Sequence, residues 1–368
     1  MAPLQPGRSP PLEEIRSDSY RQDSIWHMML TTGIMHPRPG QAAMDRRKFS
    51  LRVTATLATL PLSCFGQAQN KLWRIGMLET TSPTFNAANL EAFRERLSEL
   101  GYVEGRNLVI EYRSSDGRAE RFPAFAKELV ASKVDLIVAR GTPATMAARN
   151  ATSSTPLVIA ATGEPLLFVS DLAHPGGNIT GTSSVTADLQ AKRLGLLREL
   201  LPGMSRVAAL HNMGNPISTR QWHEIQAAGR ALGMHTELLD ARKPEDLEVA
   251  FMSASRQHVE GMVVSNDGIF DAYRKLVADL AAEHRIPAMY GSAKLVDAGG
   301  LMAYGPIYPE LYRQTANYVA KIFAGTKPGD LPIEEPARFE LVVNVGAAKA
   351  LGLTIPQSLL VRVNRVVQ

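Results

Sequence analysis

Residues 135–150, DLIVARGTPATMAARN, hold one complete unit of the fold. The first five residues predict a short apolar strand, and Gly141 ends the apolar run. Thr142 suits the N-cap of a following helix, and Pro143 suits its first position. A strand that is apolar on both faces has to be covered on both faces, which is typical of a parallel sheet between two layers of helices.

The same strand-then-helix unit recurs along the chain in two series. In the first series we expect strands at 74–78, 108–112, 135–139 and 156–161, with helices at 87–100, 119–132 and 142–150. In the second we expect helices at 187–201, 218–232, 245–256 and 272–284, with strands at 207–211, 235–239, 261–265 and 286–290. Two such series predict two α/β lobes, each built on a doubly wound parallel sheet.

Three segments interrupt the alternation of strands and helices and are expected to connect the lobes. A turn cluster at 173–181, AHPGGNITG, precedes the first crossing. Residues 301–304 lead back into a helix at 309–323, and 339–344 make the third crossing. We therefore predict a three-crossing hinge between an N-terminal lobe (72–182 plus 305–336) and a C-terminal lobe (183–304 plus 337–368). Ligands in such sheets bind beyond the carboxyl ends of the strands, so a cleft between the lobes is the expected site.

The C-terminal stretch 336–367, PARFELVVNVGAAKALGLTIPQSLLVRVNRVV, carries a family resemblance. It is similar to the closing signature of one family of ABC-transporter substrate-binding proteins, which includes binders of tryptophan and other aromatic amino acids. The resemblance extends over roughly 72–368. It implies a type I periplasmic binding fold, a small-molecule ligand, ABC permease subunits in the inner membrane as partners, and hinge closure around the ligand.

Residues 44–68, MDRRKFSLRVTATLATLPLSCFGQA, read as an export signal. A basic start at 46–48 precedes an apolar run at 53–65 that is too short to span a membrane. Gly66 and Ala68 fit a cleavage site, which predicts a mature chain beginning near Gln69 in the periplasm. The two arginines at 46–47 favour the twin-arginine route. An ordinary Sec signal is the alternative, and lipid attachment at Cys64 is a weaker one because Pro61 departs from the usual motif.

The first 43 residues are polar and rich in proline, without a sustained period. We interpret them as an over-extended gene start, with a disordered leader as the alternative. Residues 1–68 contain eight of the 40 basic and five of the 36 acidic residues, so the formal charge of +4 falls close to zero without them. The basic balance therefore gives no reason to expect a nucleic-acid partner. Cys64 is the sole cysteine, so no disulfide is expected, and we expect a monomer without a cofactor.

The loops after the predicted strands supply the candidate ligand-binding residues. They are rich in hydroxyl, amide and glycine residues, and several open helices, where free N–H groups suit a carboxylate. The candidates are Thr80, Thr81, Ser82, Gly141, Thr142, Thr162, Glu164, Thr182, Ser183, Asn212, Asn266, Asp267, Tyr290 and Tyr304. Helix capping alone is the competing explanation for any one hydroxyl. Among them, Thr142 is the expected anchor for a ligand carboxylate.

Two acids and two tyrosines complete the candidate set. Glu164 or Asp267 could accept a hydrogen bond from a ligand ammonium group, although either could be a solvated or capping acid. Glu164 also stands where family members more often carry Asp. Tyr290 and Tyr304 could flank a flat ligand, with packing in the hinge as the alternative.

Catalytic patterns are missing from the sequence. The histidines are scattered, and there is no HExxH, GxSxG, GxGxxG or GxxxxGK[ST] motif at a suitable place. We therefore expect a binding protein and not an enzyme. The family resemblance implies a periplasmic receptor of an ABC importer, with an amino acid or related carboxylate as the favoured ligand. The alternative is a ligand-sensing module that serves a membrane receptor or kinase.

Overall fold

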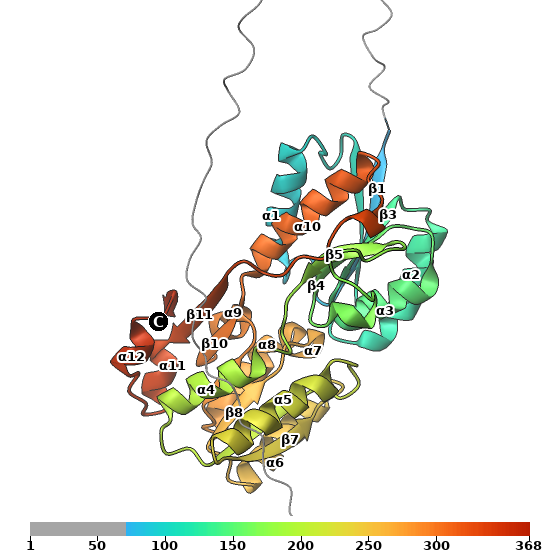
Figure 1. The fold of residues 1–368 in the computed structure, drawn as a ribbon. Helices are drawn as coiled ribbons and strands as arrows, with labels where there is room; N and C mark the ends of the chain where they lie inside the picture. Colours follow the sequence, from blue (N-terminus) through green and yellow to red (C-terminus); the bar gives the residue numbers. More distant parts are fainter. Residues whose placement is uncertain (1–70) are drawn as a thin grey trace, which may run out of the picture. The chain divides into compact units, whose positions relative to one another are not determined.

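The computed structural model describes residues 71–368 (Figure 1). The predicted leader at 1–43 and the predicted export signal at 44–68, with Cys64, lie outside these residues. No helix within 71–368 combines the length and the apolar character needed to cross a bilayer.

The first sheet has five strands in the order β2-β1-β3-β4-β5, and every neighbouring pair is parallel. Its strands are β1 Trp73–Glu79, β2 Leu108–Ser114, β3 Leu136–Arg140, β4 Leu157–Thr162 and β5 Ile179–Ser183. Its helices are α1 Ala87–Glu99, α2 Phe122–Ala131, α3 Gly141–Ala151 and α10 Tyr308–Phe323. Because β3 and β4 are buried along their whole length, both faces need cover. One face packs against α1 and α10, and the other against α2 and α3.

The second sheet has seven strands in the order β12-β11-β10-β9-β8-β6-β7, and only the β10–β11 pair is antiparallel. Its strands are β6 Arg206–His211, β7 His235–Asp240, β8 Gly261–Val264, β9 Ala288–Tyr290, β10 Met302–Pro306, β11 Phe339–Asn344 and β12 Arg365–Val367. Its helices are α4 Gln190–Leu200, α5 Ser218–Ala231, α6 Asp246–Arg256, α7 Gly268–Ala272, α8 Arg274–Glu283, α9 Ala293–Asp297, α11 Val345–Ala350 and α12 Gln357–Leu360. Two apolar clusters cover its two faces. The fold class predicted from the sequence, two mostly parallel α/β sheets, is confirmed.

The chain passes between the two sheets three times, after β5, after β10 and before β11. Helix α10 follows β10 along the chain, yet it packs into the apolar cluster of the first sheet through Tyr312 and Ala316. Gly305 and Pro306 pair with β11 and so extend the second sheet at the second passage. The exact lobe boundaries stay a prediction.

Several helices differ in detail from the sequence-based expectation. Thr142 is not the N-cap of α3, because the helix already begins at Gly141 and Arg140 holds the cap position without a side-chain hydrogen bond. The helix expected at 272–284 is divided at Tyr273, whose backbone angles (φ −105°, ψ 28°) leave the helical range and separate α7 from α8. Strand β12 has only three residues and no pattern of its own, so it is recognised only by its pairing with β11.

Gly181 in β5 marks the place where the chain leaves the first sheet. Its φ of +136° is unfavourable for residues with a side chain, and a Cβ atom there would lie 2.2 Å from the carbonyl oxygen of Ile159 in β4. The Gly181 carbonyl also accepts a hydrogen bond (3.1 Å) from the backbone N–H of Glu334, shortly before the third passage. The glycine therefore holds two of the connecting segments together.

We predict that Gly181→Ala lowers the free energy of unfolding by roughly 3 kcal/mol, because it combines backbone strain with a backbone clash. Gly195 in the middle of α4 is the matched control, since a Cβ atom there would meet no other atom within 4 Å. Gly195→Ala should raise the free energy of unfolding by about 0.5–1 kcal/mol. Urea unfolding followed by circular dichroism measures both. Equal stabilities for Gly181→Ala and the unsubstituted protein would contradict this account of β5.

Candidate ligand-binding site

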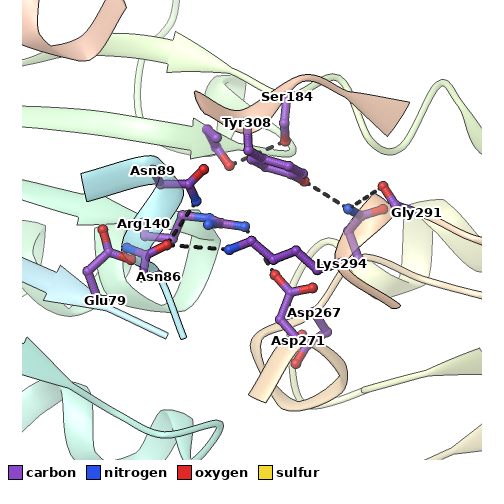
Figure 2. Close-up of polar contacts among 12 residues, drawn as sticks. Glu79, Asn86, Asn89, Arg140, Ser184, Asp267, Asp271, Gly291, Lys294 and Tyr308 are labelled. Carbon is purple, nitrogen blue, oxygen red and sulfur yellow. Dashed lines mark hydrogen bonds and ion pairs between the residues drawn. The ribbon is translucent and has the colours of Figure 1, made fainter. Parts of the chain in front are cut away.

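The loops at the carboxyl ends of both sheets meet around one cavity (Figure 2). Its volume is about 60 Å³, which is room for only a few water molecules at roughly 10–15 Å³ each. The lining residues are Thr80, Ser115, Gly117, Ala119, Phe122, Arg140, Gly141, Thr142, Pro143, Ala161, Gly163, Ser184, Thr186, Asn215, Ile217, Asn266, Asp267, Gly268, Ile269, Asp271 and Tyr308. The predicted location, beyond the strand ends of both sheets, therefore contains a cavity.

Direct polar contacts join the two sides of the cavity. The Arg140 Nη2 atom, at the end of β3, lies 3.2 Å from Asp271 Oδ2 in α7. Asn266 donates from Nδ2 to the hydroxyl of Tyr308 (2.8 Å), at the start of α10. The two sets of loops thus lie against each other.

Arg140 is held firmly in place. Its guanidinium lies 4.4 Å from the centre of the Tyr308 ring, in a cation–π contact, and 5.9 Å from that of Tyr312. The Arg140 and Asp271 side chains are each only 8% exposed. Burial disfavours the charge of Arg140, but the neighbouring Tyr312, Tyr308, Asp271 and Glu79 outweigh that penalty and raise its pKa. Arg140 is therefore a fixed positive charge in the lining.

Asp267 lies at the N-terminus of α7 and has both carboxylate oxygens engaged. Oδ1 accepts hydrogen bonds from the backbone N–H of Ile269 and from Asn212 Nδ2, both at 3.1 Å. Oδ2 accepts from Asn215 Nδ2 at 2.8 Å. Burial raises the pKa of this carboxyl, and the charge of Asp271 raises it further. Asp267 is thus a helix cap that also lines the cavity.

Two more ionisable groups lie just behind the lining. Lys294 donates from Nζ to Asn86 Oδ1 at 3.4 Å, and burial lowers its pKa to about 8. Glu79 is fully buried and accepts a hydrogen bond (2.5 Å) from the hydroxyl of Tyr312. Its pKa is raised, because burial outweighs the opposing effect of Arg140. The wall behind the cavity therefore contains one cation and one carboxyl that resists ionisation.

Five of the residues predicted from the sequence line the cavity: Thr80, Gly141, Thr142, Asn266 and Asp267. The structure gives the other hydroxyl candidates local bonds instead. Thr162 Oγ1 lies 3.2 Å from Thr142 Oγ1, Thr182 Oγ1 accepts from the backbone N–H of Ala161 (3.0 Å), and Ser183 Oγ accepts from that of Val185 (3.1 Å). The side-chain oxygens of these three residues therefore have partners within the protein, and their role in ligand binding stays a prediction.

The two candidates after β1 make other contacts within the protein. Thr81 is buried and accepts a hydrogen bond (2.6 Å) at its carbonyl from the Tyr112 hydroxyl. Ser82 Oγ accepts from the backbone N–H of Phe85 at 3.4 Å, just before α1 begins. Neither lines the cavity.

The four remaining candidates also lie outside the lining. Asn212 instead holds Asp267, as described above, and Glu164 forms an ion pair with Arg220. Tyr290 is fully buried in the apolar cluster beneath β9. Tyr304 packs against the other apolar cluster of the second sheet and stacks on Phe339, with the ring centres 6.0 Å apart. Both tyrosines therefore have the packed, apolar surroundings that we considered as the alternative to ligand contact.

Three lining residues with strong chemistry were missed from the candidate set: Arg140, Asp271 and Tyr308. A signal existed for Arg140, because a basic residue directly after a buried apolar strand is unusual. No comparable signal marks Asp271, an acid inside a helix that the sequence cannot distinguish from a solvated one. The polar residues at 265–267 could have drawn attention to it, since α7 begins one residue later.

This arrangement, with two mostly parallel sheets and a polar cavity at their adjoining carboxyl ends, is that of a two-lobe solute-binding protein. The sequence model of one family, described as "ABC transporter substrate binding protein", matches residues 82–367, and the chain belongs to that family. Proteins of this family are extracytoplasmic, and membership implies a small-molecule ligand and a permease partner.

Individual relatives agree with the family assignment. A tyrosine-binding protein of Clostridioides difficile (strain R20291) is 25% identical over 266 residues, which are 72% of this chain and 76% of the relative. Two crystal structures each match 80% of this chain. One is a conserved domain protein of Vibrio cholerae, 25% identical, with all of it covered and a TM-score of 0.76. The other is an ABC domain from Streptococcus pneumonia in complex with L-Trp, 26% identical, with 99% covered and a TM-score of 0.73.

The raised pKa of Glu79 leads to a prediction about pH. The folded protein retains a proton on Glu79 above the reference pKa of 4.5, where the unfolded chain releases it, so this group lowers stability as pH rises. Glu79→Gln mimics the protonated form and can still accept from Tyr312. We predict that its stability relative to the unsubstituted protein increases from pH 4.5 to pH 7.5, by at most about 1.4 kcal/mol per pH unit.

Urea unfolding at pH 4.5, 6 and 7.5 tests this prediction. Glu91→Gln, on the exposed side of α1, controls for the loss of a surface carboxylate. A stability difference between Glu79→Gln and the unsubstituted protein that stays constant with pH would show that Glu79 ionises normally.

Proposed function

We propose that this protein is the solute receptor of an ABC importer. It captures an amino acid or related small carboxylate in the cavity between the two sheets and delivers it to permease subunits in the inner membrane. It acts in the periplasm as a monomer, and it neither catalyses a reaction nor binds nucleic acid. The observation that carries the proposal is the pairing of opposite charges in the lining, with Arg140 from one side and Asp271 from the other.

The rest of the lining suits a ligand of this class. Hydroxyl and amide groups, such as those of Ser184 and Asn266, can bind the polar end of an amino acid. Phe122, Ile217 and Ile269 supply apolar surface for a side chain. The relatives whose names mention tyrosine and L-Trp support an aromatic amino acid within this class.

Binding has to be coupled to a motion of the lobes. The cavity of about 60 Å³ is well below the roughly 300 Å³ at which ligand pockets begin. The contacts at Asn266–Tyr308 and Arg140–Asp271 must therefore open for a ligand to enter, and the loops then close around it. Such a hinge cycle is the means by which a permease could distinguish a loaded receptor from an empty one.

A ligand screen tests the proposed function. The protein without residues 1–68 is heated in the presence of the common amino acids, small organic acids and sugars, because a ligand that binds only the folded state raises the melting temperature. Calorimetric titration of each positive compound then gives its dissociation constant. We expect an aromatic amino acid to give the largest shift. A shift with sugars or polyols alone would contradict the proposal.

The structure refines the prediction for Thr142. Thr142 lines the cavity in the first turn of α3 and is not the helix cap, and its hydroxyl lies 3.2 Å from that of Thr162. Thr142→Ala should weaken binding of the amino acid found in the screen by about 1–2 kcal/mol, the scale of a hydrogen bond to a charged group. Thr145→Ala is the matched control, because the Thr145 hydroxyl donates to Gly141 within the same helix, and Thr145 does not line the cavity. If both variants bind as tightly as the unsubstituted protein, Thr142 makes no ligand contact.

A further inference from the structure

The charged side chains that line the cavity differ in how far the protein already satisfies them. Within residues 71–368 these side chains are Arg140, Asp267 and Asp271. Asp267 has three hydrogen-bond donors on its two oxygens. Arg140 and Asp271, in contrast, form one ion pair with each other, through a single contact of 3.2 Å. Arg140 is otherwise flanked by the Tyr308 and Tyr312 rings, and Asp271 interacts electrostatically with Lys294. A ligand with charged groups can therefore replace each of these two residues as the ion-pair partner of the other.

These two charges come from opposite sides of the cavity. Arg140 ends β3 of the first sheet, and Asp271 lies in α7, which follows β8 of the second sheet. Figure 2 shows them reaching toward each other across the space between the loops. Any separation of the loops breaks their contact and returns both groups to water. When the loops close again, each buried charge must find an opposite charge, because an unpaired one is strongly destabilising.

An α-amino acid carries the two charges that meet this requirement. Its carboxylate can replace Asp271 at the guanidinium, where Arg140 also stands beside the free N–H groups at the start of α3. Its ammonium group can replace Arg140 at Asp271. Asp267 is close enough for its pKa to respond to the charge of Asp271, so a cation placed between the two acids relieves their repulsion.

We propose that the Arg140–Asp271 ion pair is exchanged for the ligand: Arg140 binds the carboxylate and Asp271 binds the ammonium group of a zwitterionic amino acid. Without ligand, the two residues bind each other and hold the loops together. This inference rests on the proposed function, because it specifies how that site recognises its ligand. The exchange keeps the number of buried charges balanced only for a zwitterion. An amine or an acid with the same side chain leaves one of the two residues without its opposite charge and should bind more weakly.

Matched ligands and variants test the exchange. The ligands are L-tyrosine, tyramine (which lacks the carboxylate) and 3-(4-hydroxyphenyl)propionate (which lacks the ammonium group), with the corresponding tryptophan series in parallel. Calorimetry of the unsubstituted protein should give about 10- to 100-fold tighter binding of the amino acid than of either analogue, the range expected for one charge-assisted hydrogen bond.

A single substitution at Arg140 or Asp271 should abolish the preference for L-tyrosine over one analogue and retain the preference over the other. Arg140→Met should reduce the preference for L-tyrosine over tyramine to within about threefold, while the preference over the propionate remains. Asp271→Asn should do the reverse. The double variant buries no unpaired charge and should bind all three ligands with similar, weak affinity. It serves as the readout if either single variant fails to fold.

A second ion pair supplies the control. Arg118 Nη2 lies 2.8 Å from Glu245 Oε1 and also joins the two sides, but both side chains are more exposed and neither lines the cavity. Arg118→Met and Glu245→Gln should leave both preferences unchanged.

The outcomes separate this inference from the function on which it rests. If the unsubstituted protein binds L-tyrosine or L-tryptophan, and the Arg140 and Asp271 variants keep both preferences, the exchange is refuted and the receptor function stands. If the unsubstituted protein binds a small organic acid but no amino acid, the exchange alone is refuted. If it binds neither class of compound, both are refuted.

Discussion

All the strands of a parallel sheet end at the same edge, and the rest of this structure depends on that constraint. The loops that follow β1, β3 and β4 of the first sheet therefore lie together, as do those that follow β6 and β8 of the second. The strands themselves are apolar and buried, so polar side chains are concentrated where they end. When two such edges adjoin, polar groups from distant parts of the chain surround one small cavity.

The chemistry of that cavity is governed by the cost of burying charge. Glu79, Asp267 and Lys294 each have a pKa displaced toward the neutral form by burial. Arg140 keeps its charge because aromatic rings and carboxylates surround it. A contact between lobes that contains a fixed cation is stable only with an opposing charge nearby. This requirement makes closure of the loops depend on the charge of the molecule that is bound between them.

The sequence predicts the fold far better than the site. The strand expected at 156–161 and the unit at 135–150 are recognisable locally, because burial on both faces leaves a continuous apolar run. The loops that could hold a ligand are also predictable, since they follow the strands. Which side chains within them face the cavity is not. Tyr290 follows the alternation of β9 into the core, as Ala288 does, and several hydroxyls bond to nearby backbone. Arg140 and Asp271 are 131 positions apart, so their contact exists only in the folded chain.

A crystal structure of the protein with the amino acid that binds most tightly tests the central claim most directly. We predict that the ligand lies between the carboxyl ends of the two sheets, with its carboxylate within hydrogen-bond distance of Arg140 and its ammonium group within that distance of Asp271. The contact between these two residues is then replaced by the ligand. A ligand bound elsewhere, or bound in the cavity with the Arg140–Asp271 pair intact, would contradict the account.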